Sequence, residues 1–222
     1  MKDDLKGAIL QRDEKTYAIV LRIPVGLLDA DKLERMAAAV RKYSIPIVKI
    51  TSGQRIALVG ITRDQIDPVW EDLGMDIGRA SELCLHYVQA CPGTTVCRYG
   101  LQDSLKLGMR LEEEFLGIGL PAKLKIGISG CPFCCSESFM RDIGAIGTKK
   151  GWELTVGGFA GYKPRVGEKI ASGLTEDDVI ALSLKAVEHY RAHCDRKMRL
   201  AKFIEQIGID ELKKALLAPE MH

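Results

Sequence analysis

Two close pairs of cysteines constrain the fold of this chain more than any other feature of its sequence. Cys91 and Cys97 are separated by five residues, and Cys131 and Cys135 by three. Each pair is bordered by Gly and Pro, which predict loops in which backbone amides are free to face sulfur. If the four thiols act together, the fold must join two loops that lie thirty-four residues apart.

The rest of the sequence favours a metal or redox role for these thiols. The first residues, MKDDLKGAILQRDEK, are charged throughout and lack the apolar segment and cleavage site of a secretory signal. We therefore expect a cytoplasmic protein, in which thiols stay reduced and seven cysteines form no disulfide framework. Four thiolates on two loops suit a [4Fe-4S] cluster, whereas structural zinc usually has spacings of roughly two to four residues. Burial as small apolar side chains is the remaining alternative.

Size and charge limit the other possibilities. With 222 residues, 46% of them hydrophobic and 28% charged, the chain can bury the core of one large domain or two small ones. A formal net charge of +2 argues against a protein that coats nucleic acid or an anionic membrane. No apolar run approaches the roughly 18 residues of a membrane-spanning helix. We expect neither nucleic acid nor membrane among its partners.

The first part of the chain predicts a compact α+β unit. Residues 16–26 are rich in β-branched side chains and predict a strand, followed by a helix that Asp29 caps. Residues 45–61 predict a hairpin, because two apolar runs flank a Ser-Gly-Gln turn. Thr62 and Gln65 have the spacing of a capping box at the start of a second helix.

The second part predicts helices and strands joined by glycine-rich loops. The expected elements are a helix over residues 101–115, a strand over 122–130, a pair of strands over 142–158, a basic loop over 159–168, a helix over 175–191 and a helical region over 196–217 with a break near Gly208. The strand over 122–130 leads directly into the second cysteine pair.

These segments resemble the sulfite and nitrite reductases that contain siroheme and a [4Fe-4S] cluster. The resemblance rests on ACPGTTVCRYG, LPAKLKIGISGCPFCC, DIGAIG and WELTVGGFAGYKPRVGE, and it extends upstream through LRIPVGLLDADKLERMAAAVRKY and VKITSGQRIALVGI. It covers about residues 16–190. It implies an α+β fold with a ferredoxin-like half-domain at residues 1–77. An α/β domain at residues 78–222 would bind the cluster and the siroheme and end in helices.

The resemblance also implies the ligands of the cluster. Cys91, Cys97, Cys131 and Cys135 would bind it, and Cys135 would in addition bridge the cluster to the siroheme iron as its axial thiolate. Cys134 falls between two of these ligands, and we interpret it as a neighbour. Spacing by itself does not exclude a C-x2-C choice of ligands.

Lys123 and Lys125 are the candidate catalytic residues. They share one face of a strand, since residues i and i+2 point the same way, and that strand ends at the cluster loop. Reduction of a small anion needs fixed positive charge and proton donors close to the reacting atoms. In the reductases that this chain resembles, a related Lys-x-Lys segment binds substrate from the other half of the molecule. The alternative is an ordinary strand with one solvated face.

Siroheme carries eight carboxylates and requires basic side chains around it. Lys163 and Arg165 match the basic segment that follows a glycine pair in the resembled family. Arg55 and Arg98 are further candidate cofactor contacts, each with a surface position as its alternative. Family members often have a basic residue at the position of Gly53, and its absence here weakens the predicted contact from this hairpin.

The predicted function is reduction of sulfite or nitrite at a siroheme that is coupled through Cys135 to the cluster. No flavin or nicotinamide motif is present, so a ferredoxin-like donor or a partner subunit would supply electrons. The alternative is a [4Fe-4S] electron-transfer subunit without siroheme, and a cluster-based redox sensor is a weaker possibility. The resembled enzymes have two related halves and this chain matches one, so we expect a homo-oligomer; a compact active form or loss of siroheme would also fit.

Overall fold

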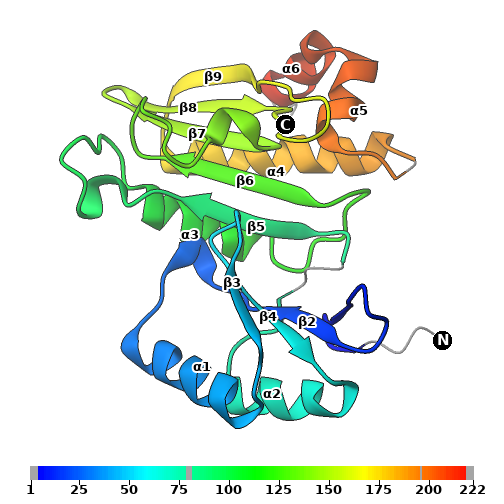
Figure 1. The fold of residues 1–222 in the computed structure, drawn as a ribbon. Coiled ribbons are helices and arrows are strands. Elements are labelled where there is room, and N and C mark those ends of the chain that lie inside the picture. The colour runs from blue at the N-terminus through cyan, green and yellow to red at the C-terminus, as the bar shows by residue number, and fades with distance from the viewer. Residues whose placement is uncertain (1–4, 79–81, 196, 219–222) are drawn as a thin grey trace. The chain divides into compact units, whose positions relative to one another are not determined.

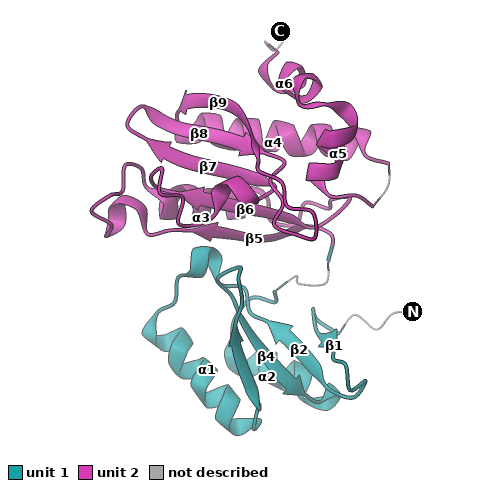
Figure 2. Ribbon diagram, turned by 45° about the horizontal axis from the view of Figure 1, so that its top comes forward, with its two compact units in different colours: residues 1–82 teal, residues 83–222 magenta. Residues whose placement is uncertain are grey.

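A computed structural model describes residues 5–78, 82–195 and 197–218. The chain divides into two compact units, residues 1–82 and residues 83–222 (Figure 2). The boundary expected from the sequence falls between residues 77 and 78. Each unit has its own sheet, and each is described separately below.

The first unit is an antiparallel sheet covered by two helices. Its strands are β1 (Ile9–Leu10), β2 (Tyr17–Val20), β3 (Ile47–Ile50) and β4 (Ile56–Ile61), in the spatial order β1-β2-β4-β3. Helices α1 (Ala30–Lys42) and α2 (Ile66–Leu73) lie next to each other (Figure 1). Leu58, Ile61 and Trp70 belong to the apolar core that the helices and the sheet enclose.

Local signals in the sequence explain where these helices begin and end. Asp29 accepts a hydrogen bond from the backbone N–H of Lys32, as a helix cap does. Thr62 and Gln65 form the predicted capping box, in a short 3-10 turn that leads into α2. The strand predicted over residues 16–26 is shorter than expected, because a 3-10 turn occupies Pro24–Gly26. Strand β1 was not predicted.

The second unit is a five-stranded mixed sheet. Its strands are β5 (Leu85–Ala90), β6 (Leu124–Ser129), β7 (Ile143–Thr148), β8 (Gly151–Val156) and β9 (Glu168–Leu174), which follow one another in space. Strands β5, β6 and β7 are parallel, and β8 and β9 pair antiparallel to their neighbours. Helices α3 (Ser104–Glu114) and α4 (Glu176–His193) pack against the sheet, and α5 (Leu200–Ile207) and α6 (Ile209–Leu217) follow (Figure 1).

The sequence predicted most of this second unit but missed two strands. The strand pair β7–β8 and the break between α5 and α6 at Gly208 are confirmed. Helix α3 begins at Ser104 rather than at residue 101, because Asp103 caps it. Strands β5 and β9 were not predicted, since polar residues interrupt their apolar pattern. Across the described ranges, no helix has both the length and the apolar character needed to cross a bilayer.

Candidate metal centre

The parallel pairing of β5 and β6 brings the two cysteine loops to one edge of the sheet. Cys91 follows the last residue of β5 directly, and Cys131 lies two residues beyond the end of β6. The backbone N–H of Cys91 donates to the carbonyl of Ile128 at 3.1 Å, which continues the ladder between the strands. Carboxyl ends of neighbouring parallel strands lie at the same edge, so both loops start there.

Glycines allow the two loops to approach closely. A Cβ atom on Gly130 would lie 2.7 Å from the Cα of Gly93 and 2.7 Å from the carbonyl oxygen of Gln102, closer than side chains tolerate. Gly93 also has a positive φ of 55°. The N–H groups of Leu101 and Gln102 both donate to the carbonyl of Gly130, at 2.8 and 3.0 Å. Only glycine fits where the loops touch.

The sulfur of Cys91 receives a backbone hydrogen bond across this contact. The N–H of Gly130 donates to Cys91 Sγ at 3.1 Å. Ser104 lies behind the loop, where its hydroxyl donates to the Cys91 carbonyl at 2.6 Å and stands 3.4 Å from the sulfur. Amide hydrogen bonds to sulfur stabilise a thiolate and tune the potential of an iron–sulfur cluster.

Cys135 lies within electrostatic reach of the other three predicted ligands. Desolvation raises the pKa of the Cys135 thiol, and Cys91, Cys131 and Cys97 raise it further. Cys131 is buried, Cys91 and Cys97 are half-buried, and Cys135 is exposed. The structure thus brings the four predicted ligands into one region of the second unit.

Cys134 also belongs to this region. It is half-buried, has a left-handed φ of 54°, and its N–H donates to the Cys131 carbonyl at 3.1 Å in a tight turn. It contributes to the raised pKa of Cys135 as well. Within the described residues, no three His, Cys, Asp or Glu side chains converge on a single-ion site. In a [4Fe-4S] cluster each thiolate binds a different iron atom, so its ligands need not converge on one point.

The predicted catalytic lysines lie at the other end of β6. Lys123 precedes the strand, Lys125 is its second residue, and both are half-buried. Lys125 and Ser129 lie four residue steps apart along the strand, a distance of about 13 Å. Burial lowers the pKa of Lys125, and the nearby guanidinium of Arg199 lowers it further. Its ammonium also lies 5.6 Å from the centre of the Tyr87 ring.

The segment after Cys135 connects the cysteine edge with the lysine end. Ser129 Oγ lies 2.8 Å from Ser138 Oγ and accepts from the N–H of Ser136 at 3.2 Å. A Cβ on Gly127 would lie 2.7 Å from Arg141 Cγ, so this segment crosses the face of β6 closely. It therefore runs back from the cluster loop toward the start of β7.

Buried charges at the lysine end were missed by the sequence analysis. Asp142 is fully buried, and its carboxylate accepts from Arg199 Nη2 at 2.5 Å and from the N–H of Lys125 at 2.8 Å. Burial raises the pKa of Asp142, which Arg199 opposes. Arg141 is also buried and donates to Gln89 at 2.7 Å and to Glu137 at 2.6 Å. In the sequence, the only indication of this buried charge was the position of Asp142 directly before the apolar strand β7.

Lys163 and Arg165 lie at the wall of a basic cavity of about 390 Å³. Its other lining residues are Phe159, Lys197, Met198, Arg199, Ala201, Lys202 and Glu205. Arg165 donates to the Ala201 carbonyl at 2.8 Å and pairs with Glu168. Within the described ranges, Lys163, Lys197 and Lys202 have no carboxylate partner. The cavity therefore has cations available for an anionic ligand.

The other two predicted cofactor contacts lie apart in the sequence and belong to different units. Arg98 is exposed, donates to the hydroxyl of Tyr99, and stacks 4.6 Å from the centre of that ring. Arg55 belongs to the first unit, where its side chain is buried beside the turn between β3 and β4. Neither lines the basic cavity described above.

Comparison with known proteins shows to which family the chain belongs. Residues 82–222 match the model for the nitrite and sulphite reductase 4Fe-4S domain. The chain belongs to the nitrite and sulfite reductase family. Residues 9–75 of this reductase match the nitrite/sulfite reductase ferredoxin-like half domain, which confirms the predicted fold class.

Two curated relatives and one solved structure show how the reductase compares in length. It is 55% identical to an assimilatory-type sulfite reductase of Nitratidesulfovibrio vulgaris, over 98% of this chain and 100% of that protein. It is 38% identical to the NAD(P)H nitrite reductase of Bacillus subtilis, over 96% of this chain but only 26% of that protein. The NirA protein of Mycobacterium tuberculosis has the same fold, with a TM-score of 0.84 at 19% identity, covering 97% of this chain and 46% of that one. The reductase is thus an oxidoreductase with a 4Fe-4S domain, as predicted.

Proposed function

We propose that this reductase reduces sulfite or nitrite at a siroheme that Cys135 bridges to a [4Fe-4S] cluster. The observation that carries the proposal is the edge of the second sheet, where glycine contacts hold the loops of Cys91, Cys97, Cys131 and Cys135 together. Sulfite is the first substrate to test, because the relative matched over its whole length is named a sulfite reductase. Nitrite is the second, because of the shorter match to a nitrite reductase.

The residues present fit the cluster. Four thiols in reach of one another, with a backbone N–H directed at Cys91, are the donor set that a [4Fe-4S] cluster takes. Cys135 is the most exposed of the four, which suits a thiolate that also faces a second group. When bound, the cluster and the siroheme supply storage of single electrons and an open iron position for the anion.

The basic cavity fits one edge of a polycarboxylate macrocycle. Its volume of about 390 Å³ lies at the lower end of the range for ligand pockets, roughly 300–1,000 Å³. Lys163 and Arg165 would bind carboxylates there, together with Lys197 and Lys202. The contacts from Arg55 and Arg98 stay predictions.

Lys123 and Lys125 would bind the anionic substrate and deliver protons to it. Lys125 is half-buried beside Arg199 and Arg141, so its surroundings are positively charged despite the carboxylate of Asp142. A lowered pKa makes an ammonium a better proton donor near neutral pH. We also propose that electrons come from a ferredoxin-like donor or partner subunit, and that the protein acts in the cytoplasm as a homo-oligomer.

An anaerobic visible spectrum, with iron and acid-labile sulfide counted on the same sample, tests this proposal. A Soret-type band above the cluster absorption is expected in the native protein. The Cys135→Ser variant should lose the cluster and its coupling to siroheme, whereas Cys194→Ser, in a different part of the second unit, should keep both. Unchanged iron and sulfide in Cys135→Ser would contradict the ligand assignment.

A cluster spectrum with about four irons but no Soret-type band, even after reconstitution with siroheme, would instead favour the electron-transfer alternative.

A further inference from the structure

The two cysteine loops present an exposed apolar surface, which we name the cysteine-loop patch and define by Val96, Tyr99, Leu101, Pro132 and Phe133. Val96 is 77% exposed and Phe133 71% exposed, so most of each residue is in contact with solvent. Tyr99, Leu101, Pro132 and Phe133 line a hollow of about 360 Å³, and Cys131 forms part of its wall. Exposed apolar side chains that gather in one place mark an interaction surface.

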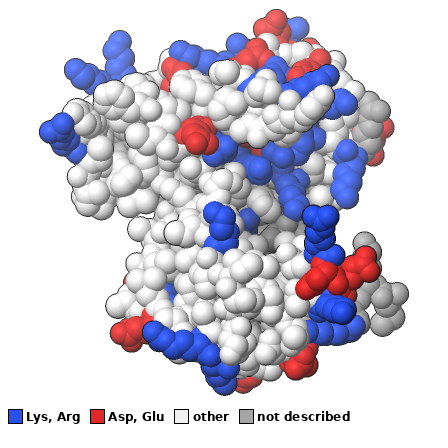
Figure 3. Space-filling model, viewed as in Figure 1, with Lys and Arg blue, Asp and Glu red and all other residues white. Residues whose placement is uncertain are grey.

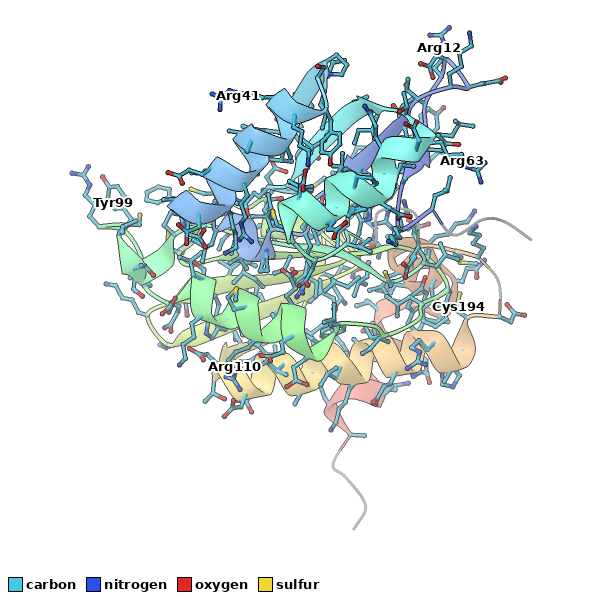
Figure 4. The ribbon with its side chains drawn as sticks, turned by 90° about the horizontal axis from the view of Figure 1, so that it is seen from below. Arg12, Arg41, Arg63, Tyr99, Arg110 and Cys194 are labelled. Atoms are coloured by element: carbon cyan, nitrogen blue, oxygen red, sulfur yellow. The ribbon has the colours of Figure 1, made fainter. Side chains whose placement is uncertain are left out.

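The aromatic side chains of the patch are held in place by each other. Tyr99 belongs to the first cysteine loop and Phe133 to the second, and their rings meet edge to face at 5.3 Å between centroids. Figure 4 shows Tyr99 at the outer end of its loop, pointing away from the ribbon. The glycine contacts between the loops therefore create this surface as well as the metal centre. Rings fixed before binding lose little side-chain entropy when a partner covers them.

Three cations lie beside the patch. Arg98 stacks on Tyr99, and Lys149 and Lys150 form the exposed turn between β7 and β8. That turn is held against the loops, because Gln102 Nε2 donates to the Thr148 carbonyl at 2.9 Å. None of these three cations pairs with a carboxylate among the described residues. Figure 3 shows Lys and Arg side chains at the left edge of the second unit, with uncharged surface between them.

We propose that the cysteine-loop patch is the docking site of an acidic one-electron carrier protein. The inference rests on the proposed function, in which electrons enter from outside. Transient protein interfaces commonly have an apolar centre and a charged rim. The charges beside this patch are positive, so they favour an acidic partner. A carrier seated on the hollow lies directly against Cys131, a predicted cluster ligand. In each docking event the carrier is oxidised by one electron and the cluster is reduced by one, with no bond formed or broken.

The test compares a protein donor with a small donor on the cluster-loaded protein. The protein probe is a photoreduced plant-type [2Fe-2S] ferredoxin, which is acidic, and the small probe is reduced methyl viologen, which needs no docking surface. Stopped-flow spectroscopy follows bleaching of the cluster, and calorimetry measures ferredoxin binding at low and high salt. The variants are Phe133→Ala and the double reversal Lys149→Glu with Lys150→Glu. Lys213→Glu with Lys214→Glu, on α6, is the matched charge control.

Ferredoxin binding to the native protein should weaken as salt increases. Both test variants should raise the dissociation constant about tenfold and slow bleaching by ferredoxin, while the α6 control keeps native values. Bleaching by methyl viologen and the iron content should stay unchanged in every variant.

Equal ferredoxin affinity in all variants, or no salt-dependent binding to the native protein, would overturn the docking proposal. A change in oligomeric mass of Phe133→Ala without a change in ferredoxin affinity would assign the patch to a contact between copies of the chain. Failure of methyl viologen to reduce the native cluster would count against the proposed function instead, and calorimetry would still decide whether the carrier docks.

Discussion

At Gly130, one added methyl group would separate the two cysteine loops. Its Cβ would meet backbone atoms of Gly93 and Gln102 at 2.7 Å, and neither can move without opening the contact. We expect Gly130→Ala to cost about 1–3 kcal/mol of stability and to lower the bound iron per chain. Gly119→Ala is the control, because a Cβ there meets nothing within 4 Å. Native iron content in Gly130→Ala would contradict this account of the loops.

Lys125 should give the reaction a dependence on pH. Burial and Arg199 lower its pKa below the ordinary 10.5, and only the protonated ammonium binds an anion or donates a proton. With methyl viologen as donor, activity should be present below this lowered pKa and should disappear as the pH rises through it. Lys125→Arg should move that loss to higher pH, because a guanidinium stays charged up to about pH 12. An identical pH profile in the variant would remove Lys125 from the proposed role.

At the scale of elements, one ion pair fixes the segment before α5 to the start of β7. Arg199 is 25% exposed and Asp142 is fully buried, so removal of the guanidinium leaves an unpaired buried carboxylate. We expect Arg199→Ala to lower the free energy of unfolding by about 3 kcal/mol, measured by urea denaturation. The surface pair of Lys169 with Glu153 is the comparison, and Lys169→Ala should cost less than about 1 kcal/mol. Similar losses in both variants would contradict the buried-pair argument.

Elements with strong local signals were predictable from the sequence, and those fixed by distant contacts were not. The capping box of Thr62 and Gln65 is complete within four residues, so the start of its helix could be read directly. Strand β5 has no such signal: His86 and Gln89 break its apolar pattern, and its place depends on pairing with β6, nearly forty residues later.

The candidate site likewise has parts that local sequence motifs predict and parts that only the tertiary fold brings together. The four cysteines share two short motifs, so the sequence was enough to predict them together as ligands. The partnership of Arg199 with Asp142 joins residues 57 positions apart, and no local pattern connects them. The basic cavity has the same origin, since Lys197 and Lys202 meet Lys163 only through the tertiary fold.

At the scale of the whole molecule, the chain carries all its cysteines in its second unit. All seven cysteines lie at or beyond residue 84, and the first unit has a complete apolar core of its own. A ligand that binds only the folded state stabilises the unit that holds it. In calorimetry of the full chain, anaerobic removal of iron should lower the melting temperature of the transition of residues 83–222 and leave that of residues 1–82 in place. An equal shift of both transitions would contradict this separation.

The parallel register of β5 and β6 also orders events during biosynthesis. A chain grows from its N-terminus, so residues 1–82 are synthesised before any of the seven cysteines at residues 84–194. Cys91 and Cys97 are the first predicted ligands to follow, yet the edge that gathers all four thiols exists only after β6 has been synthesised and has paired with β5. Delivery of iron and sulfide is therefore a late step in the life of the polypeptide, and a nascent chain that ends before β6 exposes only Cys84, Cys91 and Cys97 to oxygen.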